Sequence, residues 1–315
     1  NTTAVGNTGI GFESLKENTT GHFNSSSGSY ALRDNTTGNC NTATGTAALL
    51  SNTTGSANTA VGMNALRLNT SGSQNSAVGW LALCSNTTGV SNAAFGVCSL
   101  RLNTTGSRNT ALGPQTLYTN TTGANNTAVG YQSLYFNTIG TNNTAVGMCS
   151  LFTNSTGSSN VSIGFQSLYN NTTGAYNTAV GNSSMVTNTT GEKNTTVGLN
   201  SLFYNTSGSC NTGVGYSALQ NNTTGIRNAA LGYSALHSNT SGSYNTASGM
   251  YSLKNNTTGC QNTASGYQSL FSNTNGKWNS AFGYGALLSN GGGCFNAAVG
   301  YQTLYSNLSG RYNTA

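Results

Sequence analysis

The residues of this sequence that could do chemistry are asparagines in N-x-S/T acceptors, which recur every seventeen residues. This pattern presents an Asn side-chain amide to oligosaccharyl transfer in a secretory compartment. The spacing therefore predicts a row of N-linked glycans, with one acceptor in each repeat. The predicted glycosylation sites are Asn1, Asn18, Asn35, Asn52, Asn69, Asn86, Asn103, Asn120, Asn154, Asn171, Asn188, Asn205, Asn222, Asn239, Asn256 and Asn307.

The N-T-T-G phrase that carries these acceptors is also good turn chemistry, because Asn favours the start of a turn and Gly tolerates positive φ at its end. At Asn137, Asn273 and Asn290 the asparagine remains although the acceptor pattern is broken. A turn alone explains less well why the third residue is so regularly Thr or Ser. Glycosylation is therefore the preferred interpretation, and the turn is the alternative. Acceptors outside the series arise by chance in a chain so rich in Asn and Thr: Asn24, Asn125, Asn142, Asn160, Asn170, Asn182, Asn194, Asn221 and Asn255.

Catalytic and metal-binding constellations are not expected. General acid–base catalysis needs paired carboxylates or a histidine with a partner. The sequence has four acidic residues, two histidines and no C-x-x-C pair, so we predict no enzyme, no zinc site and no cofactor beyond covalent N-linked glycans. The seven cysteines are too scattered for a disulfide scaffold, although Cys84 and Cys98 in adjacent repeats leave one bridge open.

The charged residues are few and dispersed. They make up 4% of the chain, against roughly 25% in typical soluble proteins. The net charge of +6 is spread thinly along the chain, so we expect solubilising charges and no nucleic-acid partner. No run of some twenty apolar residues exists that would span a membrane. The basic columns are Lys16, Arg33, Arg67 and Arg101 in one, and Arg108, Lys193 and Arg227 in the other.

The whole chain is built from a seventeen-residue repeat, which occurs as eighteen full copies over residues 7–312 without an insertion or deletion. We number the repeat from its first Asn, so that Asn7 and Asn126 are at position 1 and the predicted glycan acceptors are at position 12. A strict repeat overrides the prior of two domains for 315 residues. We predict one uninterrupted solenoid over 1–315 without caps, as a segment of a longer fibre, because the chain begins and ends within a repeat.

Glycine at positions 5 and 15 of every full copy indicates two places where the backbone has positive φ or approaches its neighbour too closely for a Cβ. The segments between them are rich in Thr, Val, Tyr and Ser, which suit strands. A helix would lose several kcal/mol per repeat to the Gly, Asn and Thr content. The sequence therefore predicts an all-β parallel β-solenoid, with one coil per repeat, about 18 coils and ~4.8 Å between coils.

The expected core is thin. Positions 4 and 9 each supply one larger apolar side chain per coil, and positions 3 and 8 are small, so stacked coils would form two apolar ladders. The asparagines at positions 1 and 12 can stack in the same way, each amide bonding the one above and below. Aromatic residues recur at positions 6 and 10. They pack either on neighbouring coils or against another chain or sugar rings.

The phrase N-T-A-V-G…S-L…N-T-T-G resembles repeats of tail-fibre-like and adhesin-like proteins, and T-A-V-G is similar to the repeat in heads of trimeric autotransporter adhesins. Those heads are left-handed parallel β-rolls that assemble as trimers with a period of about fourteen residues, so handedness and trimerisation do not transfer to a period of seventeen. The dense acceptor row also looks like that of glycan-coated extracellular fibrils. The resemblance implies a β-solenoid that is part of an extracellular fibre.

The leading functional prediction is a structural glycoprotein filament, secreted or on a virion or cell surface, that associates with itself head to tail or laterally. The alternative is the spacer or shaft of an adhesive or viral tail fibre, with recognition in a tip outside this segment. A third hypothesis is ice binding through Thr ladders, because positions 2 and 13 are mostly Thr. Bulky aromatic neighbours and adjacent glycans would spoil such a surface.

Overall fold

The structure is a computed structural model that describes residues 3–315. The predicted glycan acceptor Asn1 therefore lies outside the described residues. The chain forms two compact units, residues 1–158 and residues 159–315. The described part contains β-strands and turns and no helix, and each unit is a parallel β-solenoid with one coil per seventeen-residue repeat. The predicted fold class is confirmed, whereas one uninterrupted solenoid over the whole chain stays a prediction.

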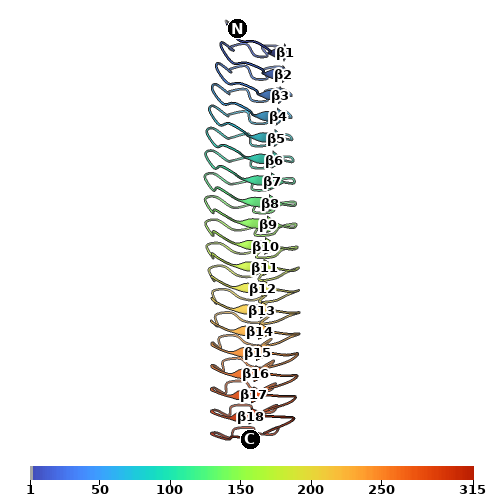
Figure 1. Ribbon diagram of the computed structural model, residues 1–315, viewed down its shortest axis with the longest axis vertical. Coiled ribbons are helices and arrows are strands. Elements are labelled where there is room, and N and C mark those ends of the chain that lie inside the picture. The colour runs from blue at the N-terminus through green and yellow to red at the C-terminus, as the bar shows by residue number, and fades with distance from the viewer. Residues whose placement is uncertain (1–2) are drawn as a thin grey trace. The chain divides into compact units, whose positions relative to one another are not determined.

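Between residues 3 and 158, the first unit contains nine short strands, which pair with one another in sequence order to form one parallel sheet (Figure 1). Each strand is joined to the next by the remainder of a coil. The strands are β1 (Thr8–Ile10), β2 (Ser25–Ser27), β3 (Thr42–Thr44), β4 (Thr59–Val61), β5 (Ser76–Val78), β6 (Ala93–Phe95), β7 (Thr110–Leu112), β8 (Thr127–Val129) and β9 (Thr144–Val146).

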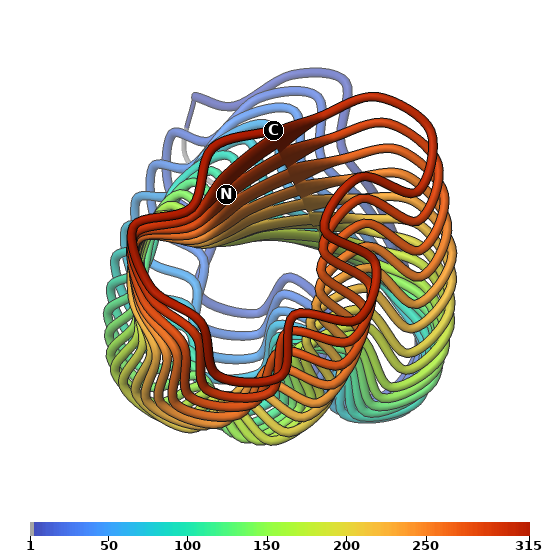
Figure 2. The ribbon, with the colours of Figure 1, turned by 90° about the horizontal axis from the view of Figure 1, so that it is seen from below.

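The second unit has the same construction, again with nine strands in sequence order. Seen end-on, its coils follow one outline, with the strands along one side and turns around the rest (Figure 2). The strands are β10 (Val161–Ile163), β11 (Thr178–Val180), β12 (Thr195–Val197), β13 (Thr212–Val214), β14 (Ala229–Leu231), β15 (Thr246–Ser248), β16 (Thr263–Ser265), β17 (Ser280–Phe282) and β18 (Ala297–Val299).

Each strand occupies repeat positions 2 to 4, and the glycine of position 5 follows it directly. The register of pairing equals the repeat, so Thr59 of β4 lies beside Ser76 of β5 and Val61 lies beside Val78. The position-5 glycines have φ near 130°, a region that residues with a Cβ rarely enter. A Cβ on Gly45 would also lie 2.8 Å from the carbonyl carbon of Gly62 in the next coil. Both predicted reasons for glycine therefore apply at position 5.

The interior is filled by positions 3, 8 and 9 together with the two asparagine columns. Ala60, Ala65 and Leu66, at these three positions of one repeat, are all 0% exposed. The prediction that position 4 supplies a core ladder is wrong: Val61 is 37% exposed, and its equivalent Ile163 is 40% exposed. The reason is the two-residue period of a strand, which sends positions 2 and 4 outward when position 3 points inward.

Three non-glycine positions of the repeat have a left-handed backbone. Position 17 has φ near 57° throughout, whether it is Ala57, Arg108 or Tyr244. Positions 7 and 9 share this conformation, so even the buried Leu66 has φ of 50°. For residues with a Cβ, this region costs roughly 1–2 kcal/mol. Glycine occurs in this conformation in two copies, at Gly6 and Gly285, so the fold accepts it there.

We predict that Ala57→Gly stabilises the protein by about 1 kcal/mol. Ala57 is exposed and its φ is 57°, so glycine relieves the left-handed strain without removing a packed side chain. The midpoint of chemical denaturation measures the effect. The matched control is Ala124→Gly at position 16, where φ is not positive and glycine should destabilise. Equal effects of the two substitutions would contradict the assignment of strain to position 17.

Candidate functional site

The position-12 asparagines form a hydrogen-bonded column inside each unit. The Asn103 side-chain Nδ2 donates to Oδ1 of Asn86 in the preceding coil at 2.9 Å, and to the Gly106 carbonyl of its own turn at 2.9 Å. Its Oδ1 accepts from Nδ2 of Asn120 in the following coil at 2.7 Å. Both amide hydrogens of Asn103 are therefore used, and the same pattern recurs along the column. The asparagine is at position 12 because its amide joins three consecutive coils.

The position-1 asparagines form a second column that meets the first at the position-15 glycine. Asn92 Nδ2 donates to the Gly106 carbonyl at 2.9 Å, so this oxygen accepts from both columns. The Asn92 backbone N–H donates to Oδ1 of Asn75 at 2.9 Å. The predicted stacking of Asn at position 1 is confirmed. The position-12 column and the next coil leave no room for a side chain at position 15, because a Cβ on Gly106 would overlap Asn103 Oδ1 and the Gly123 carbonyl oxygen.

The T-T-G part of the turn wraps around a carbonyl of the next coil. The backbone N–H groups of Thr104, Thr105 and Gly106 all point at the Thr121 carbonyl, at 2.9, 3.3 and 3.3 Å. The Thr104 hydroxyl donates to the same oxygen at 3.1 Å. Position 13 is thus Thr because its hydroxyl completes this contact. The side chain of Thr105 at position 14, the third residue of the acceptor pattern, is exposed to solvent.

The structure brings the predicted glycosylation sites of each unit into one column and places their amides in the interior. Attaching a glycan to Asn103 in this fold would remove one of two N–H donors and would force the side chain out. N-glycosylation of position 12 stays a prediction, and this placement weighs against it. Asn307 is half-buried and bonds Asn290 Oδ1 at 2.9 Å, and the others are at most 2% exposed: Asn18, Asn35, Asn52, Asn69, Asn86, Asn103, Asn120, Asn154, Asn171, Asn188, Asn205, Asn222, Asn239 and Asn256.

The acceptors outside the series occupy different places. Asn125, Asn142 and Asn182 are exposed, the first two in left-handed conformation at position 17 and the third at position 6. Asn170, Asn221 and Asn255 are half-buried, whereas Asn24, Asn160 and Asn194 belong to the buried position-1 column. The acceptors that are most accessible in this fold are thus among those that sequence reasoning set aside as chance matches.

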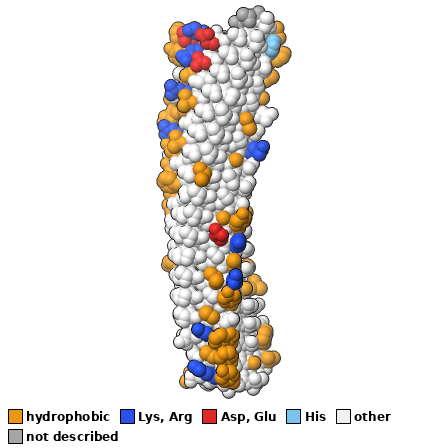
Figure 3. Space-filling model, turned by 90° about the vertical axis from the view of Figure 1, so that its left-hand side faces the viewer, with side chains coloured by type: hydrophobic (Ala, Val, Ile, Leu, Met, Phe, Trp, Pro, Cys, Tyr) orange, Lys and Arg blue, Asp and Glu red, His pale blue; other side chains and the backbone are white. Residues whose placement is uncertain are grey.

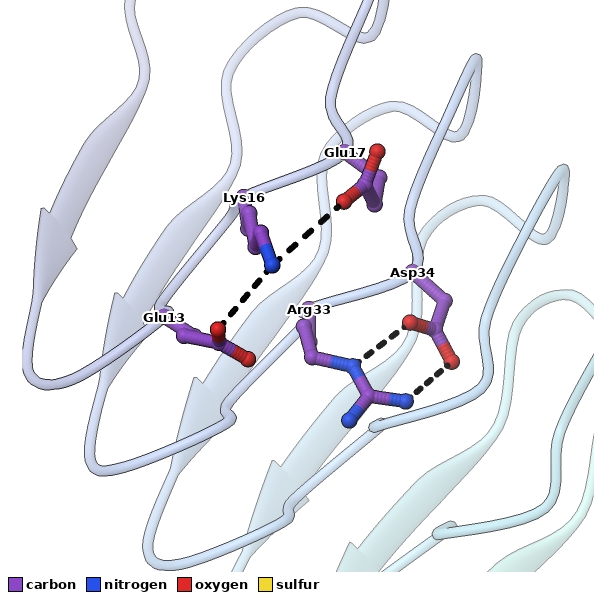
Figure 4. A network of polar contacts seen from close by, with 5 residues as sticks. All are labelled: Glu13, Lys16, Glu17, Arg33 and Asp34. Atoms are coloured by element: carbon purple, nitrogen blue, oxygen red, sulfur yellow. Dashed lines mark hydrogen bonds and ion pairs between the residues drawn. The ribbon is translucent and has the colours of Figure 1, made fainter.

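The acidic side chains of the first unit lie in its first two coils, where they form ion pairs with Lys16 and Arg33 (Figure 4). Lys16 Nζ lies 2.9 Å from Glu13 and 4.0 Å from Glu17, and Arg33 makes a two-point contact with Asp34 at 2.7 and 3.1 Å. The Glu13 contact raises the pKa of Lys16, and the Asp34 contact raises the pKa of Arg33. Among residues 3–315, no group of three or more His, Cys, Asp and Glu side chains could hold a metal ion.

The first histidine and the cysteines have separate places in the coils. His22 Nδ1 accepts a hydrogen bond from the backbone N–H of Val5 at 3.1 Å.

All seven cysteines are free thiols, so the bridge left open between Cys84 and Cys98 is not formed. Burial raises the pKa of the Cys84 thiol, and the positive charges of Arg67 and Arg101 offset part of this rise. Within the described residues, no helix is long and apolar enough to cross a membrane.

Aromatic side chains form stacks along the surface. Tyr216 and Tyr233 at position 6 have ring centroids 4.9 Å apart at 10°, and Tyr118 and Tyr135 at position 10 are 5.0 Å apart at 4°. The ring faces therefore contact one another in neighbouring coils, and their edges are left for other partners. A third stack, at position 17, was missed from the sequence, although aromatic residues occur in three consecutive copies there: Trp278, Phe295 and Tyr312.

The surface otherwise presents many large apolar side chains among uncharged polar ones (Figure 3). Exposed apolar residues at position 4 include Phe95, Leu231 and Phe282. A scan against protein-family models and a search of curated proteins find no match for this chain.

Proposed function

We propose that this chain is a structural shaft segment of an extracellular filament. The observation that carries the proposal is the repetition of one bonding scheme in every coil: two buried asparagine columns, a Leu column and a turn closed on the next coil. Such a scheme stabilises coils through their neighbours, since a single repeat could not bury its own core. The residues that recur most strictly hold coils together.

Self-association is part of the proposal, and the outward positions 4, 6 and 10 are its proposed surface. Their apolar side chains, such as Phe95 and Tyr131, are exposed in a chain with few charges to keep copies apart. Exposed apolar patches mark protein interaction surfaces when they are contiguous. A structural filament and the spacer shaft of an adhesive fibre would be built from the same coils. Both functions are compatible with this surface.

Carbohydrate on the filament remains part of the proposal, with a different set of acceptors. We place it on the exposed Asn125, Asn142 and Asn182, because a glycan there leaves both buried columns intact. Ice binding is disfavoured. The position-13 hydroxyls, such as that of Thr104, donate to carbonyls of the next coil, and the exposed Phe95 interrupts the face of position 2.

Cryo-electron microscopy of filaments from the native source tests the proposal. The expected result is an unbranched filament with a repeat of ~4.8 Å along the coils. Density for carbohydrate should extend from Asn125, Asn142 and Asn182 and be absent at Asn103. Globular particles without this repeat would overturn the structural proposal. Sugar density on Asn103 would contradict the placement of the glycans and restore the acceptor series of position 12.

A further inference from the structure

One column of the first unit carries basic side chains at a regular interval. Position 10 is Arg33, Arg67 and Arg101 in every second coil, with Leu50 and Cys84 between them. Since neighbouring coils pair as parallel strands, each arginine lies about 9.6 Å along the sheet from the next, two strand spacings of ~4.8 Å. The uncharged residue between each pair keeps the guanidinium groups apart. The result is a sparse row of three arginines, one in every second coil, and Lys16 in the same column of the first coil is already paired with Glu13.

The three arginines differ in how far their charge is already satisfied. Asp34 engages Arg33 through two hydrogen bonds. Arg101 donates to the Tyr118 hydroxyl and lies over that ring at 5.6 Å, which leaves it positively charged. Arg67 is exposed and is in none of the ion pairs found among residues 3–315. The acidic side chains of the first unit are all in its first two coils, so Arg67 and Arg101 are the groups able to receive an anion.

A depression of about 360 Å³ lies between Arg33 and Arg67. It exists because Ala47 is small where the adjacent coils have Tyr30 and Asn64 at the same repeat position. Ala47 and Leu50 contribute apolar side chains to its lining. The Tyr30 hydroxyl and the Asn64 amide, also in the lining, can form hydrogen bonds with hydroxyl groups of a ligand. Its lining is Tyr30, Arg33, Ala47, Leu50, Asn64 and Arg67.

We propose that this row binds an acidic polysaccharide. Carboxylate or sulfate groups bind Arg67 and Arg101, and one sugar ring lies in the depression. The guanidinium of Arg67 matches two oxygens of such a group. The apolar side chains of Ala47 and Leu50 suit the carbon face of a pyranose, and Tyr30 and Asn64 suit its hydroxyl groups. Asp34 repels a further anion at Arg33, so the anionic groups lie at Arg67 and beyond it. This surface is the arginine-bearing stretch of position 10 in the first unit, whereas the proposed self-association uses the apolar side chains of that column in other coils.

The spacing of the arginines favours a polysaccharide over a nucleic acid as the ligand. One strand of a DNA duplex carries a phosphate about every 3.4 Å of helix axis, and a groove that binds nucleic acid needs basic groups at comparable density. A row with one arginine about every 9.6 Å, two strand spacings apart, instead fits a polysaccharide that turns the acidic group of every second sugar toward the row. An acidic polypeptide could satisfy the charges but would not use the sugar-sized depression.

The experiment measures binding of polygalacturonate to the full chain at low ionic strength, where exposed charges act most strongly. We expect Arg67→Gln/Arg101→Gln to weaken binding about tenfold, roughly threefold for each exposed contact. The matched control is Arg108→Gln/Lys193→Gln, which removes the same charge from exposed side chains of position 17 and should change binding less than about twofold. Thermal melting of each variant confirms that it is folded.

Several outcomes would overturn the proposal. Equal losses in the two double variants would mean that net charge alone attracts the polymer. Binding of a single-stranded polynucleotide more tightly than polygalacturonate would favour a nucleic-acid ligand. Polyglutamate binding as tightly as polygalacturonate would remove the role of the depression. Absence of binding to polygalacturonate and to a sulfated dextran would reject the site altogether.

Discussion

Gly106→Ala is expected to destabilise the first unit by about 3–4 kcal/mol, because it combines overpacking with the loss of buried hydrogen bonds. A Cβ at this position overlaps Asn103 Oδ1 and the Gly123 carbonyl, and lies 2.9 Å from Asn120 Nδ2. Backbone atoms of the next coil cannot rotate away as a flexible side chain could. Relief requires the coils to separate, which lengthens bonds in both asparagine columns.

The measurement is the midpoint of chemical denaturation together with amide hydrogen exchange. We expect the amides of Thr104 and Thr105 to lose protection, since they bond the neighbouring Thr121 carbonyl. The control is Gly9→Ala at position 3, where most copies have Ala and a Cβ would have contacts of 3.4 Å or more. Gly9→Ala should be neutral or slightly stabilising. Similar midpoints for the two variants would refute the close approach at position 15.

The fold could be predicted from the sequence because its period is strict. Two glycines per repeat exclude a helix, and an unbroken seventeen-residue register permits in-register parallel coils. The stacking of the position-1 asparagines could be predicted from the same register. The left-handed conformation of position 9 could not be predicted, because Leu has no local preference for it. There the packing of the side chain inside the coil outweighs the backbone cost.

The site was harder to predict because one phrase serves two purposes. N-T-T-G matches a glycan acceptor and also a turn whose Asn faces the interior. A signal for the buried column was in the sequence at Asn137, which has no acceptor pattern yet forms the column bond to Asn120 Oδ1 at 2.7 Å. A similar signal marked position 4 as outward, since Thr44, Ser248 and Ser265 occur there among the apolar residues. Variation between polar and apolar types is typical of an exposed position.

The position-12 column can be tested by introducing a charge into it. Asn103→Asp removes both donated hydrogen bonds and sets a carboxylate against two acceptors, Asn86 Oδ1 and the Gly106 carbonyl. A buried carboxylate without enough donors is costly, so we expect a loss of about 4 kcal/mol at neutral pH. Asn120 Nδ2 still donates to the new side chain and offsets a small part of this loss.

The loss should depend on pH with a definite sign. The buried site raises the pKa of the carboxyl group introduced by Asn103→Asp above its value in the unfolded chain, because burial disfavours the charged form. The protonated acid can donate one hydrogen bond to Asn86 Oδ1. The penalty is therefore smallest below the unfolded pKa and grows as pH rises through the unfolded pKa towards the folded pKa, above which it is complete. Asn125→Asp, on an exposed side chain, adds the same charge and should show neither the loss nor the pH dependence. A pH-independent stability of Asn103→Asp equal to that of Asn125→Asp would mean that position 12 faces solvent and is free to carry a glycan.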